Sequence, residues 1–152
     1  MTHNSLRILS IAVNYNRMGF CFFVGKQPMD WQLVFEAAKS ASKAEAQIRK
    51  WLEYYSPDIV ITEDPKTLRR KGDRTKMLLD ILNRIIQKTD VQHIEAGRVQ
   101  PYKNRYDQIE KFCEKYPQLK AISPKRPQFF QKEPPYVTLF DAVSMAETVF
   151  TE

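Results

Sequence analysis

Glu63 is the first candidate for chemistry, because it follows a short apolar run, DIVIT at 58–62, and precedes Asp64 and Pro65. A continuous apolar run of this length is typical of a buried parallel strand. A carboxylate at the carboxyl end of such a strand points into the crevice where open α/β sheets bind ligands, so it could contact a metal ion or a substrate. Asp64 could instead form an Asx turn or a helix cap before the proline. Glu63 is therefore the stronger candidate of the two.

Asp141 is the second candidate, in the segment YVTLFDAVSMA at 136–146. Helical spacing puts it in a stripe of small and polar residues that also contains Thr138. Small neighbours leave room for an ion beside the carboxylate. The alternative is that Asp141 lies on the solvent-exposed face of the helix. The apolar stripe next to it consists of Leu139, Val143, Ala146 and Phe150.

The net charge of +6, from 24 basic and 18 acidic residues, is unevenly distributed. Residues 66–76 carry +5 and residues 98–132 carry +6, which leaves −5 for the remainder. The second segment mixes basic with aromatic side chains, a combination suited to phosphate contacts and base stacking. Both segments could also be ordinary solvated surface. The candidate contacts to nucleic acid are Lys66, Arg69, Arg70, Lys71, Arg74, Lys76, Lys125 and Arg126.

Five strands and four helices are expected to position these side chains. Residues 7–25 predict two strands around the polar turn NYNR, and residues 31–37 a third strand. Ser42 and Glu45 have capping-box spacing at the start of a helix that Pro57 ends. Further strands are predicted over 58–62 and 91–96. A second helix is predicted to begin near Asp73 or Thr75 and to carry Leu78, Ile81, Leu82, Ile85 and Ile86. Further helices are predicted over 105–116 and from 135 or 136 to the end.

This order predicts one α/β domain over residues 1–152, with a mixed sheet and helices on both of its faces. A hydrophobic content of 43% argues against a disordered chain. No apolar run approaches the roughly 18 residues that span a bilayer, and the first residues lack the apolar region of a secretion signal. We therefore expect a cytoplasmic protein without membrane contact, whose two cysteines, Cys21 and Cys113, are buried thiols. Two histidines and four glycines argue against a histidine-rich zinc site and a glycine-rich phosphate cradle.

Three segments in this order resemble the RuvC-type Holliday-junction resolvases of the RNase H-like (retroviral integrase) superfamily. They are ILSIAVNYNRMGFCFF at 8–23, PDIVITEDP at 57–65 and LFDAVSMAETVF at 139–150. The resemblance implies an RNase H-like five-stranded mixed sheet, with three antiparallel strands followed by parallel ones. In that family an Asp on the first strand, a Glu ending the fourth strand and two acids three residues apart on the last helix bind two Mg²⁺ or Mn²⁺ ions. These ions activate water and stabilise the leaving oxygen of the phosphodiester.

Glu63 and Asp141 fall on two of these four acids. Thr138 falls on the first helical acid and keeps an oxygen without a charge, and Ala12 falls on the first-strand Asp and can bind no metal. Two carboxylates provide too little negative charge for two divalent ions, so the resemblance implies a degraded metal site. Conceivable nearby substitutes are Asp64, Glu95, Glu133, Asn14 and Asn16, but none combines the right residue type with the right place.

The sequence thus predicts a nucleic-acid-binding relative of these resolvases that acts on branched or duplex DNA and whose catalytic site is impaired. One alternative is an active endonuclease that cleaves DNA junctions with Mg²⁺ or Mn²⁺ at Glu63 and Asp141. In that case Arg70, Arg74 and Lys76 would contact phosphates near the site. A second alternative is a protein-interaction scaffold with no role in nucleic-acid binding. The resemblance is also compatible with a homodimer, since enzymes of this family work as dimers.

Overall fold

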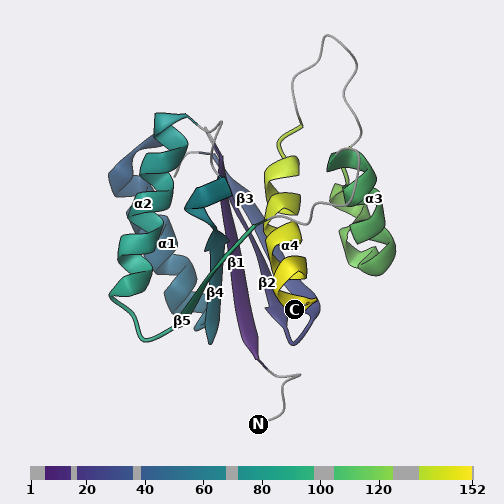
Figure 1. The fold of residues 1–152 in the computed structure, drawn as a ribbon, viewed down its shortest axis with the longest axis horizontal. Coiled ribbons are helices and arrows are strands. Elements are labelled where there is room, and N and C mark those ends of the chain that lie inside the picture. The colour runs from purple at the N-terminus through teal and green to yellow at the C-terminus, as the bar shows by residue number, and fades with distance from the viewer. Residues whose placement is uncertain are drawn as a thin grey trace.

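The computed structural model describes residues 6–14, 17–35, 39–67, 72–97, 105–124 and 134–151. Five strands form one sheet in the order β3-β2-β1-β4-β5 (Figure 1). β1, β2 and β3 pair in antiparallel fashion, whereas β4 is parallel to β1, and β5 to β4. The expected mixed sheet is therefore confirmed. Its strands are β1 (Arg7–Asn14), β2 (Arg17–Val24), β3 (Gln27–Val34), β4 (Ile59–Glu63) and β5 (Gln92–Ala96).

Helices cover both faces of the sheet, as the sequence predicts (Figure 1). Successive residues of a strand point to opposite faces. In β1, Leu9 and Ile11 pack with α1 (Ala41–Tyr55) and α2 (Asp73–Gln87). Ile8 and Ala12 pack on the other face, with α3 (Arg105–Lys115) and α4 (Val137–Phe150). The short 3₁₀ helices η3 (Pro65–Thr67) and η4 (Pro117–Ile122) follow β4 and α3.

The helix α4 lies against the centre of the sheet and is buried on every side from Val137 to Glu147. The Ser10 hydroxyl of β1 donates a hydrogen bond to the carbonyl of Ala142, 2.7 Å away. A Cβ atom added at Gly19 of β2 would lie only 3.4 Å from the Cα of Leu139, so this glycine lets the helix backbone approach the sheet. The alternative that Asp141 lies on a solvent-exposed face is therefore wrong.

Two element boundaries differ from those predicted. The third strand covers 27–34 instead of 31–37, because a two-residue turn at Gly25, whose φ is 62°, returns the chain directly from β2. Pro28 is tolerated in β3 because the strand lies at the edge of the sheet. The cap of α1 is Ser40 instead of Ser42, and its side chain accepts a hydrogen bond from the Lys43 amide.

The helix α2 begins at Asp73, as predicted, but its N-cap is Gly72, which provides no side-chain cap.

Cys21 and Cys113 are buried free thiols, as expected. Among the described residues, no helix is both long and apolar enough to cross a membrane.

Candidate functional site

The four residues that the resemblance places at the positions of the resolvase acids come from three elements, beginning with β1 and β4. Ser10 pairs with Ile61 across these parallel strands, and Ala12 and Glu63 follow two residues later on each strand. Because side chains alternate, Ala12 and Glu63 point to the face that α4 covers. Both are buried, Ala12 with 1% and Glu63 with 1% of its surface exposed. Glu63, at the carboxyl end of β4, therefore lies on the face of the sheet that α4 covers.

The other two positions, Thr138 and Asp141, lie one turn apart on α4 and therefore share a side of the helix. The turn that carries them lies close to Ala12, because Gly19, the partner of Ala12 on β2, approaches the backbone of Leu139. Thr138 is fully buried and Asp141 is 6% exposed. The structure thus brings Ala12, Glu63, Thr138 and Asp141 to one end of one face.

Asp141 forms an ion pair with Arg105, the first residue of α3. The Nη2 atom of Arg105 lies 2.6 Å from Oδ2 of Asp141, and 9% of the Asp141 side chain is exposed. A buried carboxylate needs such a charged partner to offset the loss of its hydration. Sequence reasoning missed Arg105, which lies 36 positions from Asp141 in the chain. The sequence indicates only that a buried acid requires a cation as its partner, and any of the 24 lysine and arginine residues could be that partner.

Thr138 contains a polar atom without a visible role in the fold. Its Oγ1 atom is buried and has no hydrogen-bond partner within the described part of the chain. Ser10, a buried hydroxyl on the same face, does have a partner, the carbonyl of Ala142. An unpaired buried hydroxyl is unfavourable, so Thr138 differs from the ordinary polar side chains of this core.

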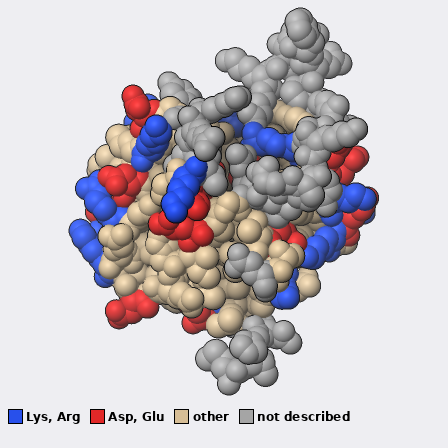
Figure 2. Space-filling view, in the orientation of Figure 1, with Lys and Arg blue, Asp and Glu red and all other residues tan. Residues whose placement is uncertain are grey.

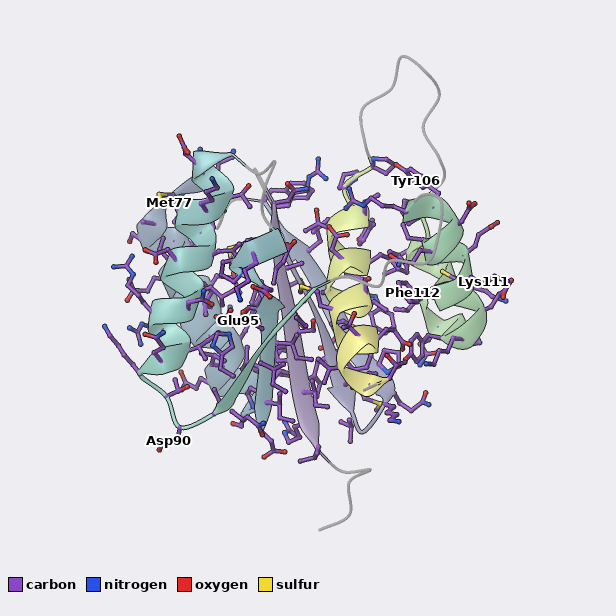
Figure 3. All side chains as sticks on the ribbon, viewed as in Figure 1. Met77, Asp90, Glu95, Tyr106, Lys111 and Phe112 are labelled. Atoms are coloured by element: carbon purple, nitrogen blue, oxygen red, sulfur yellow. The ribbon has the colours of Figure 1, made fainter. Side chains whose placement is uncertain are left out.

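Two of the predicted substitutes for the missing acids, Asp64 and Glu95, do not join this group. The Oδ1 atom of Asp64 accepts a hydrogen bond from the Lys66 amide, 3.0 Å away, which is the Asx-turn alternative. Glu95 pairs with Thr62, which faces α2 and contacts Asn83, so Glu95 lies on the opposite face from Glu63 (Figure 3). Asn14, the last residue of β1, lies two positions after Ala12 and therefore on the same face of the sheet. Glu133 and Asn16 lie outside the described residues.

The described residues do not fit the two-metal site of the resolvase family. Within the described ranges, no group of three or more His, Cys, Asp or Glu side chains could hold a metal ion. Of the four residues that the resemblance assigns to the metal site, Ala12 and Thr138 carry no carboxylate, and Asp141 is already paired with a guanidinium. Divalent magnesium is held by carboxylate oxygens that must be free to bind it.

A second buried acid of α4 provides a comparison. Glu147 is 6% exposed, and its Oε2 atom lies 2.8 Å from Nζ of Lys115 on α3. Its Oε1 atom accepts a hydrogen bond from the Tyr116 hydroxyl, and burial, together with this carboxylate, raises the pKa of Tyr116. Both buried acids of α4 are therefore balanced by basic residues of α3. Phe112 of α3 points toward α4, whereas Lys111 points away from it (Figure 3).

The predicted nucleic-acid contacts lie partly within the described residues. Lys66 of η3 and Lys76 of α2 are exposed, and Arg74 is partly buried. All three follow the carboxyl end of β4, the end that carries Glu63. In Figure 2, basic side chains are visible at both flanks and toward the upper edge, with acidic side chains interspersed. Arg69, Arg70, Lys71, Lys125 and Arg126 lie outside the described residues.

No protein-family model and no curated protein matches this sequence. Several solved structures are similar to this chain. The Thermus thermophilus RuvC in complex with a Holliday junction substrate has a TM-score of 0.64 at 14% identity, over 94% of this chain and 91% of that one. The fowlpox virus Holliday junction resolvase has a TM-score of 0.65 at 13% identity, over 96% and 99%.

The yeast mitochondrial Holliday junction resolvase is also similar, with a TM-score of 0.58 at 12% identity, over 95% of this chain and 78% of that one. Similarity at such low identity shows the fold and no more. The chain has the RNase H-like fold in the form found in RuvC and other Holliday-junction resolvases.

Proposed function

We propose that this protein binds branched or duplex DNA at the edge of the sheet where β1 and β4 end, and that it does not cleave the DNA. The observation that carries the proposal is the ion pair between Arg105 and Asp141, in a site where Ala12 and Thr138 replace two acids. The resolvase fold and the solved complex of a similar protein with a Holliday junction support DNA as the ligand.

The charge of the site argues against cleavage. Glu63 and Asp141 together carry two negative charges, and the Arg105 guanidinium offsets one of them. Two-metal hydrolysis needs two divalent ions that hold the attacking and leaving oxygens. Two carboxylates, one of them already paired with a guanidinium, provide too few ligands to hold both ions. The fold can therefore retain a surface for DNA without the means of hydrolysis.

Basic residues next to the site supply the attraction to DNA. Lys66 and Lys76 are exposed and follow the strand that ends at Glu63. Each phosphate that a basic residue neutralises releases counterions, so the logarithm of the binding constant falls with the logarithm of salt by about 0.9 per phosphate. Binding through this edge should therefore be steeply dependent on salt and largely independent of sequence.

A pair of charge reversals tests where the DNA binds. We expect Lys66→Glu/Lys76→Glu to weaken binding to a labelled four-way junction about tenfold or more in 100 mM salt, and to lower the slope against salt by about 2, one unit per lost phosphate contact. Fluorescence anisotropy over a salt series measures both quantities.

The matched control is Lys50→Glu/Lys88→Glu, which changes the net charge equally on exposed residues of α1 and at the end of α2. We expect at most a small loss of affinity for this control. An equal loss in the two variants would mean that the whole molecule, and not this edge, attracts DNA. Failure of the unmodified protein to bind any junction at physiological salt would favour the alternative of a protein-interaction scaffold.

A further inference from the structure

We propose that the Arg105 guanidinium takes the place of a divalent cation beside Asp141, at the end of the sheet where Glu63 and Thr138 also lie. The guanidinium keeps metal ions away from the Asp141 carboxylate, and its removal increases the affinity of this region for a divalent cation. The inference extends the proposed function, since it gives Arg105 a role in keeping metal ions out, but no step of its test uses DNA.

The geometry of the ion pair is the first support. Arg105 begins α3 and reaches Oδ2 of Asp141 at 2.6 Å, the short distance of a charge-assisted hydrogen bond. The Asp141 side chain is 9% exposed and the Arg105 side chain 36%, so the carboxylate is buried whereas the arginine is partly in contact with solvent. A guanidinium has only donors and remains charged at every physiological pH. Arg105 therefore places a permanent positive charge at Oδ2 of Asp141. A metal ion would need this same oxygen as a ligand.

The unpaired hydroxyl of Thr138 is the second and independent support. Its Oγ1 atom is fully buried and has no hydrogen-bond partner among the residues the structure describes. It lies one helical turn before Asp141, on the same side of α4. Glu63 points from β4 to the face that α4 covers and is 1% exposed. Three oxygen-bearing side chains thus face one region, and oxygen ligands are those that Mg²⁺ and Mn²⁺ prefer.

The ion pair between Lys115 and Glu147 is an example in this fold of a buried carboxylate whose charge is balanced by a basic residue. It joins the same two helices, with Nζ 2.8 Å from Oε2 of a buried glutamate. The other oxygen of Glu147 already accepts a hydrogen bond from the Tyr116 hydroxyl. Removing Lys115 should therefore destabilise the protein without creating a cation site, which makes Lys115→Ala the matched control.

The test is Mn²⁺ binding to the full chain, measured by loss of the electron paramagnetic resonance signal of free Mn²⁺ and by the rise in melting temperature. We expect Arg105→Ala and Arg105→Gln to bind Mn²⁺ roughly 10 to 100 times more tightly than the unmodified protein, the range that corresponds to the loss of one charge-assisted hydrogen bond. Arg105→Lys keeps the charge and should bind as weakly as the unmodified protein. Adding Glu63→Gln or Asp141→Asn to Arg105→Gln should abolish the gain.

Several outcomes would overturn the proposal. These are Mn²⁺ binding by the unmodified protein as tight as that by Arg105→Gln, no gain in affinity in the Arg105 variants, and the same gain in Lys115→Ala. Arg105→Gln fills most of the space of the arginine, so it protects the test against misfolding of Arg105→Ala. If both variants unfold, recovery of the folded state by millimolar Mn²⁺ supports the proposal, and no recovery counts against it. Loss of DNA binding alone would leave these results unaffected and would contradict only the proposed function.

Discussion

Thr138 and Ser10 are two buried hydroxyls on the same face of the sheet, and they differ in one respect. Ser10 donates to the carbonyl of Ala142 at 2.7 Å, whereas Oγ1 of Thr138 has no partner in the described part of the chain. A buried polar group without a partner retains the cost of its lost hydration. The Thr138 hydroxyl therefore does not contribute to stability, which is typical of residues at functional sites.

Exchanging each hydroxyl for an apolar group of similar shape tests this difference. We expect Thr138→Val to raise the free energy of unfolding by about 1 kcal/mol, because it removes an unpaired hydroxyl and keeps the branched shape. Ser10→Ala should lower it by about 1 kcal/mol, because a paired donor is lost. Urea denaturation monitored by circular dichroism measures both. A loss of stability in Thr138→Val would show that its hydroxyl is paired in solution.

His93 gives the folded protein a predictable response to pH. It lies on β5, and its Nε2 atom is 2.7 Å from Oγ1 of Thr62. Burial lowers the pKa of His93 from its usual value of 6.5. The unfolded chain therefore binds a proton as the pH falls through 6.5 while the folded state does not, and the free energy of unfolding decreases.

We expect the contribution of His93 to the stability of the unmodified protein to be fully present above pH 6.5 and to be lost progressively as the pH falls below 6.5. In His93→Gln this part of the pH dependence should be absent. Thermal denaturation at half-unit steps of pH compares the two proteins. Parallel curves for the two proteins would mean that His93 titrates alike in the folded and unfolded states.

The sequence could indicate Glu63 and Asp141 but not Arg105, and the reason is physical. Strand ends and helix spacing are local patterns, so an acid at the carboxyl end of an apolar run or within an apolar helix can be recognised. The ion pair with Arg105 depends on how α3 packs beside α4, which no local pattern describes. The same limit applies to Glu95, whose side of the sheet follows from the register of β5 with β4.

At the scale of elements, the position of α4 determines the arrangement of the site. The helix carries Thr138 and Asp141, and its first turns lie against β2 at Gly19. A methyl group at residue 19 would meet the Cδ1 atom of Leu33 at 3.3 Å and the Cα of Leu139 at 3.4 Å. The Leu33 side chain can move away, but the helix backbone cannot move without shifting Asp141.

Larger residues at position 19 should therefore be increasingly unfavourable. We expect Gly19→Ala to cost less than about 1 kcal/mol and Gly19→Val to cost about 1–3 kcal/mol, the usual range for overpacking a core. Gly72→Ala is the control, because nothing lies within 4 Å of a Cβ atom there. Chemical denaturation of the three variants tests the contact. Equal stability of Gly19→Val and the unmodified protein would show that α4 does not lie closely against β2 in solution.

The elements themselves were largely predictable, and the exceptions have local causes. Alternation and apolar runs predicted all five strands because each strand packs helices on one or both faces. The third strand begins at Gln27, earlier than predicted, because the turn at Gly25 is shorter than the apolar pattern indicates. The burial of α4 on all sides was not predicted, since its polar stripe is typical of an exposed face. That stripe lies instead against other parts of the protein.

At the scale of the whole molecule, the fold and the charges point to different conclusions. The fold is that of Holliday-junction resolvases, and exposed Lys66 and Lys76 follow the strand that ends in the site. These features favour contact with DNA. Of the four positions that the resemblance assigns to catalytic acids, only Glu63 and Asp141 are acidic, and Arg105 forms an ion pair with Asp141. The combination favours a protein that holds a DNA junction and leaves it intact.

Incubation of the unmodified protein with an end-labelled four-way junction, in Mg²⁺ or Mn²⁺, tests this conclusion most directly. The products are resolved once on a native gel for binding and once on a denaturing gel for cleavage. We predict a shifted complex on the native gel and intact strands on the denaturing gel with either metal. Strand cleavage that Glu63→Gln or Asp141→Asn abolishes would contradict the account, because it would show that these two acids still form a working catalytic site.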